Sequence, residues 1–151
     1  MTATNEAQVD EAIEHLNLPP RSIEKLSALE AQGALSAVRS AFVEGNPRAL
    51  WLGLKLPSRA LRYEQKDWPD CLVQDCASVG ATEGFLIIES SGEGYHVYRC
   101  TSFEAVGQVL SECGFFEYAI VDYQLQWLIA DTDHNEMIIV SKIAEQLAIS
   151  V

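Results

Sequence analysis

Two apolar runs separated by a short glycine-containing loop, FLIIE at 85–89 and YHVYRC at 95–100, decide the fold. The loop between them, SSGEG at 90–94, has the length and composition that join two antiparallel strands. Both runs are rich in β-branched and aromatic residues, which favour extended backbone. The stretch therefore predicts a β-hairpin, around which an antiparallel sheet is expected to form.

A helix is expected directly after the hairpin. Apolar residues recur at helical spacing between Phe103 and Cys113. Thr101 and Glu104 have the spacing of a capping box, and Gly114 stands where a C-cap glycine belongs. These signals predict a helix that begins after Thr101 and ends before Gly114.

Three further strands are expected over 115–122, 124–131 and 136–141. Because the links between them are very short, the strands are expected to form an antiparallel meander. Side chains in the first of these strands point alternately to the two faces of the sheet. One face is therefore expected to lie in the core and the other to be partly exposed to water.

The first 45 residues have helical patterns. Apolar residues at helical spacing predict a first helix over 5–17, which ends before Pro19. Ser22 is expected to cap a second helix whose first apolar face carries Ile23. Farther along, the apolar positions shift around the helix, and this shift predicts a break at Gly33.

The stretch between the helical part and the hairpin is less regular. It predicts a strand over 49–54, an irregular basic-leaning segment over 57–66 and a short helix over 70–78. A last short helix is expected over 142–148.

These elements predict one α+β domain over 1–151, with a helical part over 1–45 and a sheet-containing part over 49–151. The expected architecture is N-terminal helices followed by a mostly antiparallel sheet of five to six strands. Two intervening helices interrupt the sheet, and a meander ends it.

The charge balance restricts the classes of partner. Asp and Glu number 22 against 10 Lys and Arg, a formal net charge of -12. A field of this sign repels nucleic-acid backbones and anionic membranes. The surplus of carboxylates either serves solubility alone or matches a basic protein, which is the partner expected if there is one. The N-terminus has no signal-peptide pattern and no apolar run is long enough to span a bilayer, so a cytoplasmic location is expected.

No linear pattern points to a catalytic or metal centre. Cys71 and Cys76 are too far apart around a helix to share a face, and 131–136 lacks the glycine of a calcium loop, so neither a metal nor a cofactor is expected. His96 and Cys100 can approach Asp122 across the sheet, but no nucleophile signature surrounds them. A non-enzymatic role is expected, and the four cysteines are expected to be free, buried thiols.

Residues 114–122, GFFEYAIVD, and 127–134, WLIADTDH, resemble the C-terminal meander of small bacterial proteins, some of which belong to toxin-immunity sets. The better-known superfamily of this kind is the SUKH immunity superfamily. Its tryptophan and glycine signature is not found in 50–69, so no site residue is carried over. The resemblance implies a small acidic α+β protein that binds and neutralises a toxin.

Three functions are compatible with these features: an immunity protein that neutralises a basic toxin or effector, an adaptor, and a small enzyme or ligand-binding domain whose site forms only in three dimensions. For the first, acids at strand ends are expected to converge on one rim of the sheet, with two aromatic residues as buried anchors. The expected acids are Glu89, Glu93, Asp122, Asp131 and Asp133, and the expected anchors are Tyr123 and Trp68.

Overall fold

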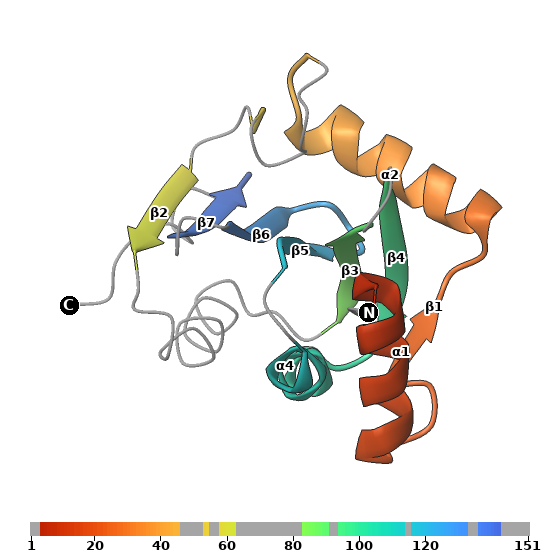
Figure 1. Ribbon diagram of the computed structural model, residues 1–151. Helices are drawn as coiled ribbons and strands as arrows, with labels where there is room; N and C mark the ends of the chain where they lie inside the picture. Colours follow the sequence, from red (N-terminus) through yellow and green to blue (C-terminus); the bar gives the residue numbers. More distant parts are fainter. Residues whose placement is uncertain are drawn as a thin grey trace.

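The computed structural model describes residues 4–45, 53–54, 58–62, 83–90, 94–113, 116–132 and 136–142. Its elements, in chain order, are α1 (Asn5–Leu16), β1 (Ile23–Lys25), α2 (Ala28–Phe42), β2 (Ser58–Arg62), β3 (Gly84–Glu89), β4 (Tyr95–Cys100), α4 (Phe103–Glu112), β5 (Tyr118–Asp122), β6 (Trp127–Thr132) and β7 (Glu136–Ser141) (Figure 1). Among these elements, no helix combines the length and the apolar character that crossing a membrane requires.

The described strands form one seven-stranded sheet in the order β1-β4-β3-β5-β6-β7-β2, and every neighbouring pair is antiparallel. The expected α+β class, the hairpin of β3 with β4 and the meander of β5 to β7 are confirmed. The sheet has more strands than expected because β1 and β2 join its two edges. The helix expected over 70–78 lies outside the described residues.

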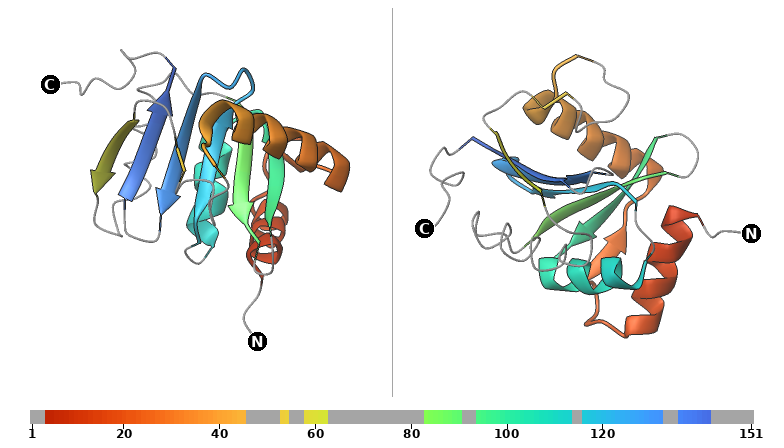
Figure 2. Two further views of the ribbon diagram at one scale, coloured as in Figure 1. Left: turned by 90° about the horizontal axis from the view of Figure 1, so that it is seen from above. Right: turned by 60° about the vertical axis from the view of Figure 1, so that its left-hand side comes forward.

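Helices cover both faces of the sheet, as Figure 2 shows. One face buries residues such as Tyr98 and Ile120 against α1 and α4, through Val9 and Val106 among others. The opposite face packs against α2, chiefly around Phe42. This second face holds a buried cluster of its own under α2, while Phe85, Tyr95 and Ile138 on it stay partly exposed, as expected for a partly wet face.

The N-terminal part differs from the expected pair of helices. Residues 23–25 form strand β1, in which Ile23 lies opposite Cys100 of β4, and the backbone N–H of Leu26 donates to the carbonyl of Val97 at 2.9 Å. The helix begins later, where Ser27 and Glu30 form a capping box. It then runs without a break through 33, so the expected interruption there is wrong.

The cap of α4 and one edge of the sheet also differ from the expected structure. Ser102, not Thr101, caps α4, because its hydroxyl accepts from the N–H of Ala105 while the Thr101 hydroxyl donates to the carbonyl of Arg21. Residues 58–62, expected to be irregular, pair with β7 as the edge strand β2. Of the strand expected over 49–54, only Gly53 and Leu54 are described, and the helix expected over 142–148 lies almost wholly outside the described residues.

Helix α1 is held along β4 by two matched side-chain pairs. The Glu6 carboxylate lies 3.3 Å from Nε2 of His96, and the Tyr98 hydroxyl donates to Asp10 at 2.9 Å. Four residues of helix rise about 6 Å and two residues of strand about 6.6 Å, so both pairs meet without distortion. Burial, followed by the hydrogen bond to Asp10, raises the pKa of Tyr98, which keeps its hydroxyl a donor.

Candidate functional site

The expected acidic rim is divided between opposite ends of the sheet. Antiparallel pairing places Glu89 opposite Tyr95, whereas Asp122 lies opposite Gly84 at the other end of β3. The two ends of β3 are five residues apart, which is about 17 Å at about 3.3 Å per residue. Glu89 and Asp122 therefore do not converge, and the single rim expected from the sequence is wrong.

Asp131 is not a surface residue. Its exposed fraction is 1%, and it lies opposite Tyr118 and Met137 in the sheet. A carboxylate in this position faces the protein interior and offers no contact to a partner. Glu93, Asp133 and Trp68 lie outside the described residues.

Tyr123 has a structural role in the turn after β5. Its hydroxyl donates to the carbonyl of Cys100 at 2.9 Å, and its ring meets that of Phe85 edge-on at 4.9 Å between centroids. Burial raises the pKa of Tyr123, consistent with a side chain held against the sheet. A partner would have to displace both contacts to use this residue as an anchor.

The nucleophilic grouping considered from the sequence is not assembled. His96 pairs with Glu6 near the start of β4, whereas Cys100 ends that strand, about 13 Å farther along. Gly84 of β3 lies opposite Cys100 of β4 on one side and opposite Asp122 of β5 on the other. Asp122 is therefore at the same end of the sheet as Cys100 and away from His96. Over the part of the chain that the structure describes, no three His, Cys, Asp or Glu side chains gather in a way that could hold a metal ion.

The two described cysteines are expected to react slowly with thiol reagents at neutral pH. Both are free; burial raises the pKa of Cys100 to about 12 and that of Cys113 to about 11, so both remain thiols rather than thiolates. The measurement is the labelling rate of a Cys71→Ser/Cys76→Ser variant before and after denaturation. Labelling of the native variant as fast as that of the unfolded chain would contradict this prediction.

Helices α1 and α4 carry an uncompensated acidic surface. Neither contains a Lys or Arg, and together they contain the carboxylates of Glu6, Asp10, Glu11, Glu14, Glu104 and Glu112. Glu6 and Asp10 have partners in His96, Tyr98 and Lys25, and the other four are exposed. Within the described ranges, none of these four lies within 4 Å of a Lys or Arg nitrogen. We call Glu11, Glu14, Glu104 and Glu112 the acidic face.

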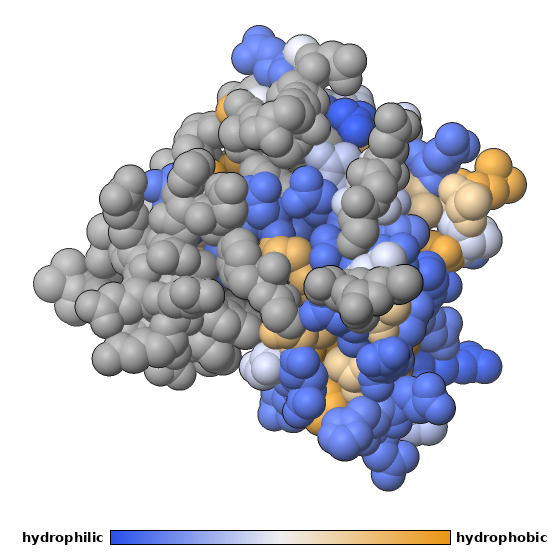
Figure 3. Space-filling view, in the orientation of Figure 1, coloured by the Kyte–Doolittle hydropathy of each residue, from blue (hydrophilic) through white to orange (hydrophobic). Residues whose placement is uncertain are grey.

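The space-filling view shows predominantly hydrophilic side chains over α1 and α4 (Figure 3). Helix α2 on the other side of the sheet differs, because it carries one acid and one base. Its Glu30 lies 3.9 Å from Arg99, and its Arg39 lies over the ring of Tyr95. The negative charge of the described helices is thus concentrated on one side of the sheet.

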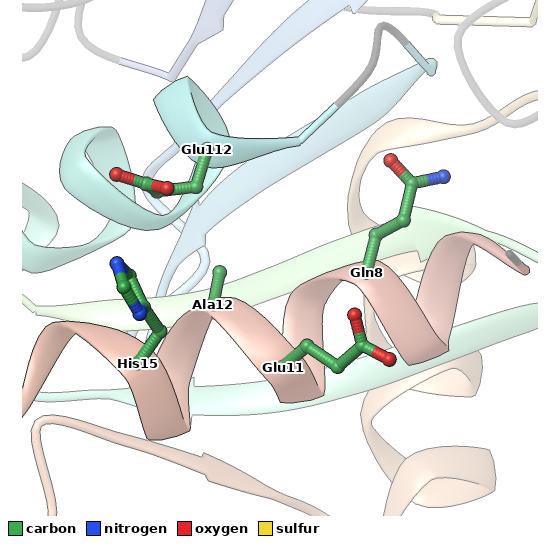
Figure 4. Close-up of a pocket in the computed structure, with 5 residues that line it drawn as sticks. All are labelled: Gln8, Glu11, Ala12, His15 and Glu112. Atoms are coloured by element: carbon green, nitrogen blue, oxygen red, sulfur yellow. The ribbon is translucent and has the colours of Figure 1, made fainter.

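A groove of about 320 Å³ lies between α1 and α4 (Figure 4). Helix α1 lines it with side chains at i, i+3, i+4 and i+7, which share one side of a helix, and α4 contributes its last residue. The lining residues are Gln8, Glu11, Ala12, His15 and Glu112.

Sequence reasoning missed this site, although one signal was available. Segments 5–16 and 103–112 both lack Lys and Arg while carrying acids, and the apolar stripes of both predict that they pack on a core. The sequence alone does not predict that these two helices, which are far apart in the chain, lie side by side on the same face of the sheet. In comparisons of the chain with protein-family models, curated proteins and solved structures, no match is found.

Proposed function

We propose that this protein is a non-catalytic binding domain that docks a basic protein on its acidic face. As the specific role, we propose an immunity protein that neutralises a basic toxin or effector. The observation that carries the proposal is the acidic face, with four exposed carboxylates on two adjacent helices and no Lys or Arg in either. The resemblance of 114–122 and 127–134 to immunity proteins supports the same class of partner.

An acidic surface affects the rate of association with a basic partner as well as the affinity. Carboxylates gathered on one side create a field that accelerates the approach of a cationic surface. Proteins that act on nucleic acids carry such surfaces, because they must neutralise phosphates. An acidic domain bound there would occupy the position of the substrate without needing any catalytic group of its own.

The test begins with affinity capture from a lysate of the source cells at low salt, followed by identification of the bound protein by mass spectrometry. The expected result is one basic partner whose expression alone arrests growth and whose toxicity is relieved by co-expression of this protein. Failure to capture a basic protein, together with a small metabolite that raises the melting temperature, would contradict the proposal.

Charge reversal on the acidic face is expected to slow association with that partner by about tenfold, while dissociation changes less. The variant is Glu11→Lys/Glu104→Lys, measured by surface plasmon resonance at low and physiological salt. The matched control, Glu44→Lys/Glu83→Lys, changes the net charge equally at exposed positions outside the acidic face. Equal slowing by both variants would show that net charge, not this face, steers the partner, and the assignment of the face would be wrong.

A further inference from the structure

One carboxylate of α1 has an oxygen buried against an imidazole of the sheet. Oε2 of Glu6 is shielded from solvent, and Nε2 of His96 lies 3.3 Å from it. The exposed fractions of the two side chains are 26% for Glu6 and 28% for His96. Because a buried carboxylate oxygen needs a donor, we assign a proton to Nε2 of His96. The contact is an ion pair when the imidazole is charged and a weaker contact when it is neutral.

The groups nearest to this pair keep their charge near neutral pH. Asp10, one turn farther along α1, accepts from the Tyr98 hydroxyl at 2.9 Å and lies 3.6 Å from Nζ of Lys25. Carboxylates and ammonium groups do not ordinarily change charge between about pH 5.5 and 8. Burial raises the pKa of Tyr98, so its hydroxyl also keeps its proton. On β3, the residue opposite His96 is the apolar Ile88.

Other charged groups on the neighbouring elements lie farther from the imidazole. Among the described residues, Glu6 alone has a carboxylate oxygen within 4 Å of a nitrogen of His96. Helix α2 packs on the opposite face of the sheet, so its charges do not face the imidazole. The charged residues that lie beyond this distance are Glu24 on β1, Glu89 on β3, Glu30 and Arg39 on α2, and Glu104 and Glu112 on α4.

Polar contacts contribute to the attachment of α1 because its apolar contact with the sheet is small. Only Val9 and Ala12 of this helix are buried, whereas Ile13 and Leu16 are partly exposed. Local opening of such a helix is governed by the few contacts that it makes. Loss of one ion pair is therefore expected to change how often α1 opens.

We propose that the Glu6–His96 pair makes the attachment of α1 to the sheet dependent on pH. With Glu6 ionised and His96 protonated, the pair stabilises the attached helix. As the pH rises and the imidazole loses its proton, this contribution is lost, so α1 opens more often above neutral pH than at about pH 5.5. The inference does not rest on the proposed function. It implies that the two helices of the acidic face are held together most firmly at mildly acidic pH.

The experiment measures hydrogen exchange of backbone amides by NMR in the full-length protein, corrected for the intrinsic pH dependence of exchange. Every protein compared carries His15→Gln, because His15 in the last turn of α1 also titrates and its charge favours that helix end. Protection of the α1 amides relative to those of α2 is expected to fall about fivefold between about pH 5.5 and 8.

Three variants identify the groups responsible. His96→Gln keeps an amide donor close to the position of Nε2 but carries no charge, so its protection is expected to be independent of pH and equal to the high-pH value. Glu6→Gln removes the charge from the other partner, and the same loss of pH dependence is expected. Glu14→Gln is the matched control, because it removes an exposed carboxylate from the same helix and is expected to keep the fivefold change.

A pH dependence that disappears in both His96→Gln and Glu6→Gln but persists in Glu14→Gln supports the proposal. Protection that does not change with pH in the His15→Gln protein would overturn it. So would a change that survives His96→Gln or Glu6→Gln, because the titrating group would then lie elsewhere.

Discussion

Replacing Gly84 with alanine is expected to lower the free energy of unfolding by about 3 kcal/mol or more. A Cβ atom at this position would overlap the carbonyl oxygen of Val121 and lie 2.9 Å from Cζ of Phe103. The carbonyl belongs to β5, which pairs with β3 through Phe85 and Val121 and so cannot turn aside. The ring of Phe103 has little freedom either, because it packs edge-on against Trp127 at 5.6 Å between centroids.

The matched control is Gly107→Ala in α4. A Cβ atom there would have no neighbour within 4 Å. Because alanine also favours helical backbone, the free energy of unfolding of this variant is expected to rise by about 0.5–1 kcal/mol. Urea denaturation followed by circular dichroism measures both changes. A Gly84→Ala variant as stable as the natural protein would show that β3 and β5 are less closely paired than in this structure.

Replacing Phe42 with alanine is expected to cost about 3–5 kcal/mol, the usual range for removing a fully buried aromatic side chain. Phe42 is the last residue of α2, and its exposed fraction is 0%. Its ring packs with Val38 and Val140 in the cluster that joins α2 to the sheet, and Nζ of Lys142 lies 5.9 Å from the ring centroid. Without the ring, a cavity would remain between the helix and the sheet.

Leu29→Ala, near the start of the same helix, serves as its control. The Leu29 residue is 80% exposed, so its truncation is expected to change stability by less than about 0.5 kcal/mol. Thermal and urea unfolding of both variants measure the difference. Comparable losses of stability at the two positions would mean that the solvent-facing side of α2 is also buried.

Local signals were sufficient wherever the residues that define an element are neighbours in the chain. The hairpin of β3 and β4 follows from two apolar runs around a glycine loop, and β7 spans the predicted 136–141. The start of α2 was also readable, because Ser27 and Glu30 have the spacing of a capping box. The interpretation of Ser22 as the cap was wrong because Ile23 pairs with Cys100, a contact across the sheet.

The candidate site shows the same division between local and tertiary information. A net charge of -12 led us to expect an acidic surface, but did not show where on the fold the carboxylates gather. Glu89 and Asp122 both end predicted strands, yet the antiparallel register sends them to opposite ends of β3. Glu11 and Glu112 belong to helices nearly a hundred residues apart, and only their packing on one face of the sheet brings them to one groove.

The sequence by itself thus determined the fold class, the hairpin, the meander and the sign of the charge on the surface. These properties depend on the composition of the chain and on the spacing of apolar residues, which can be seen within a single segment. The tertiary structure decided that α2 covers the second face of the sheet, that Asp131 is buried, and that the acidic face and its groove lie on α1 and α4. Each of these depends on strand register and on which helices share a face, and both are set by packing between distant segments of the chain.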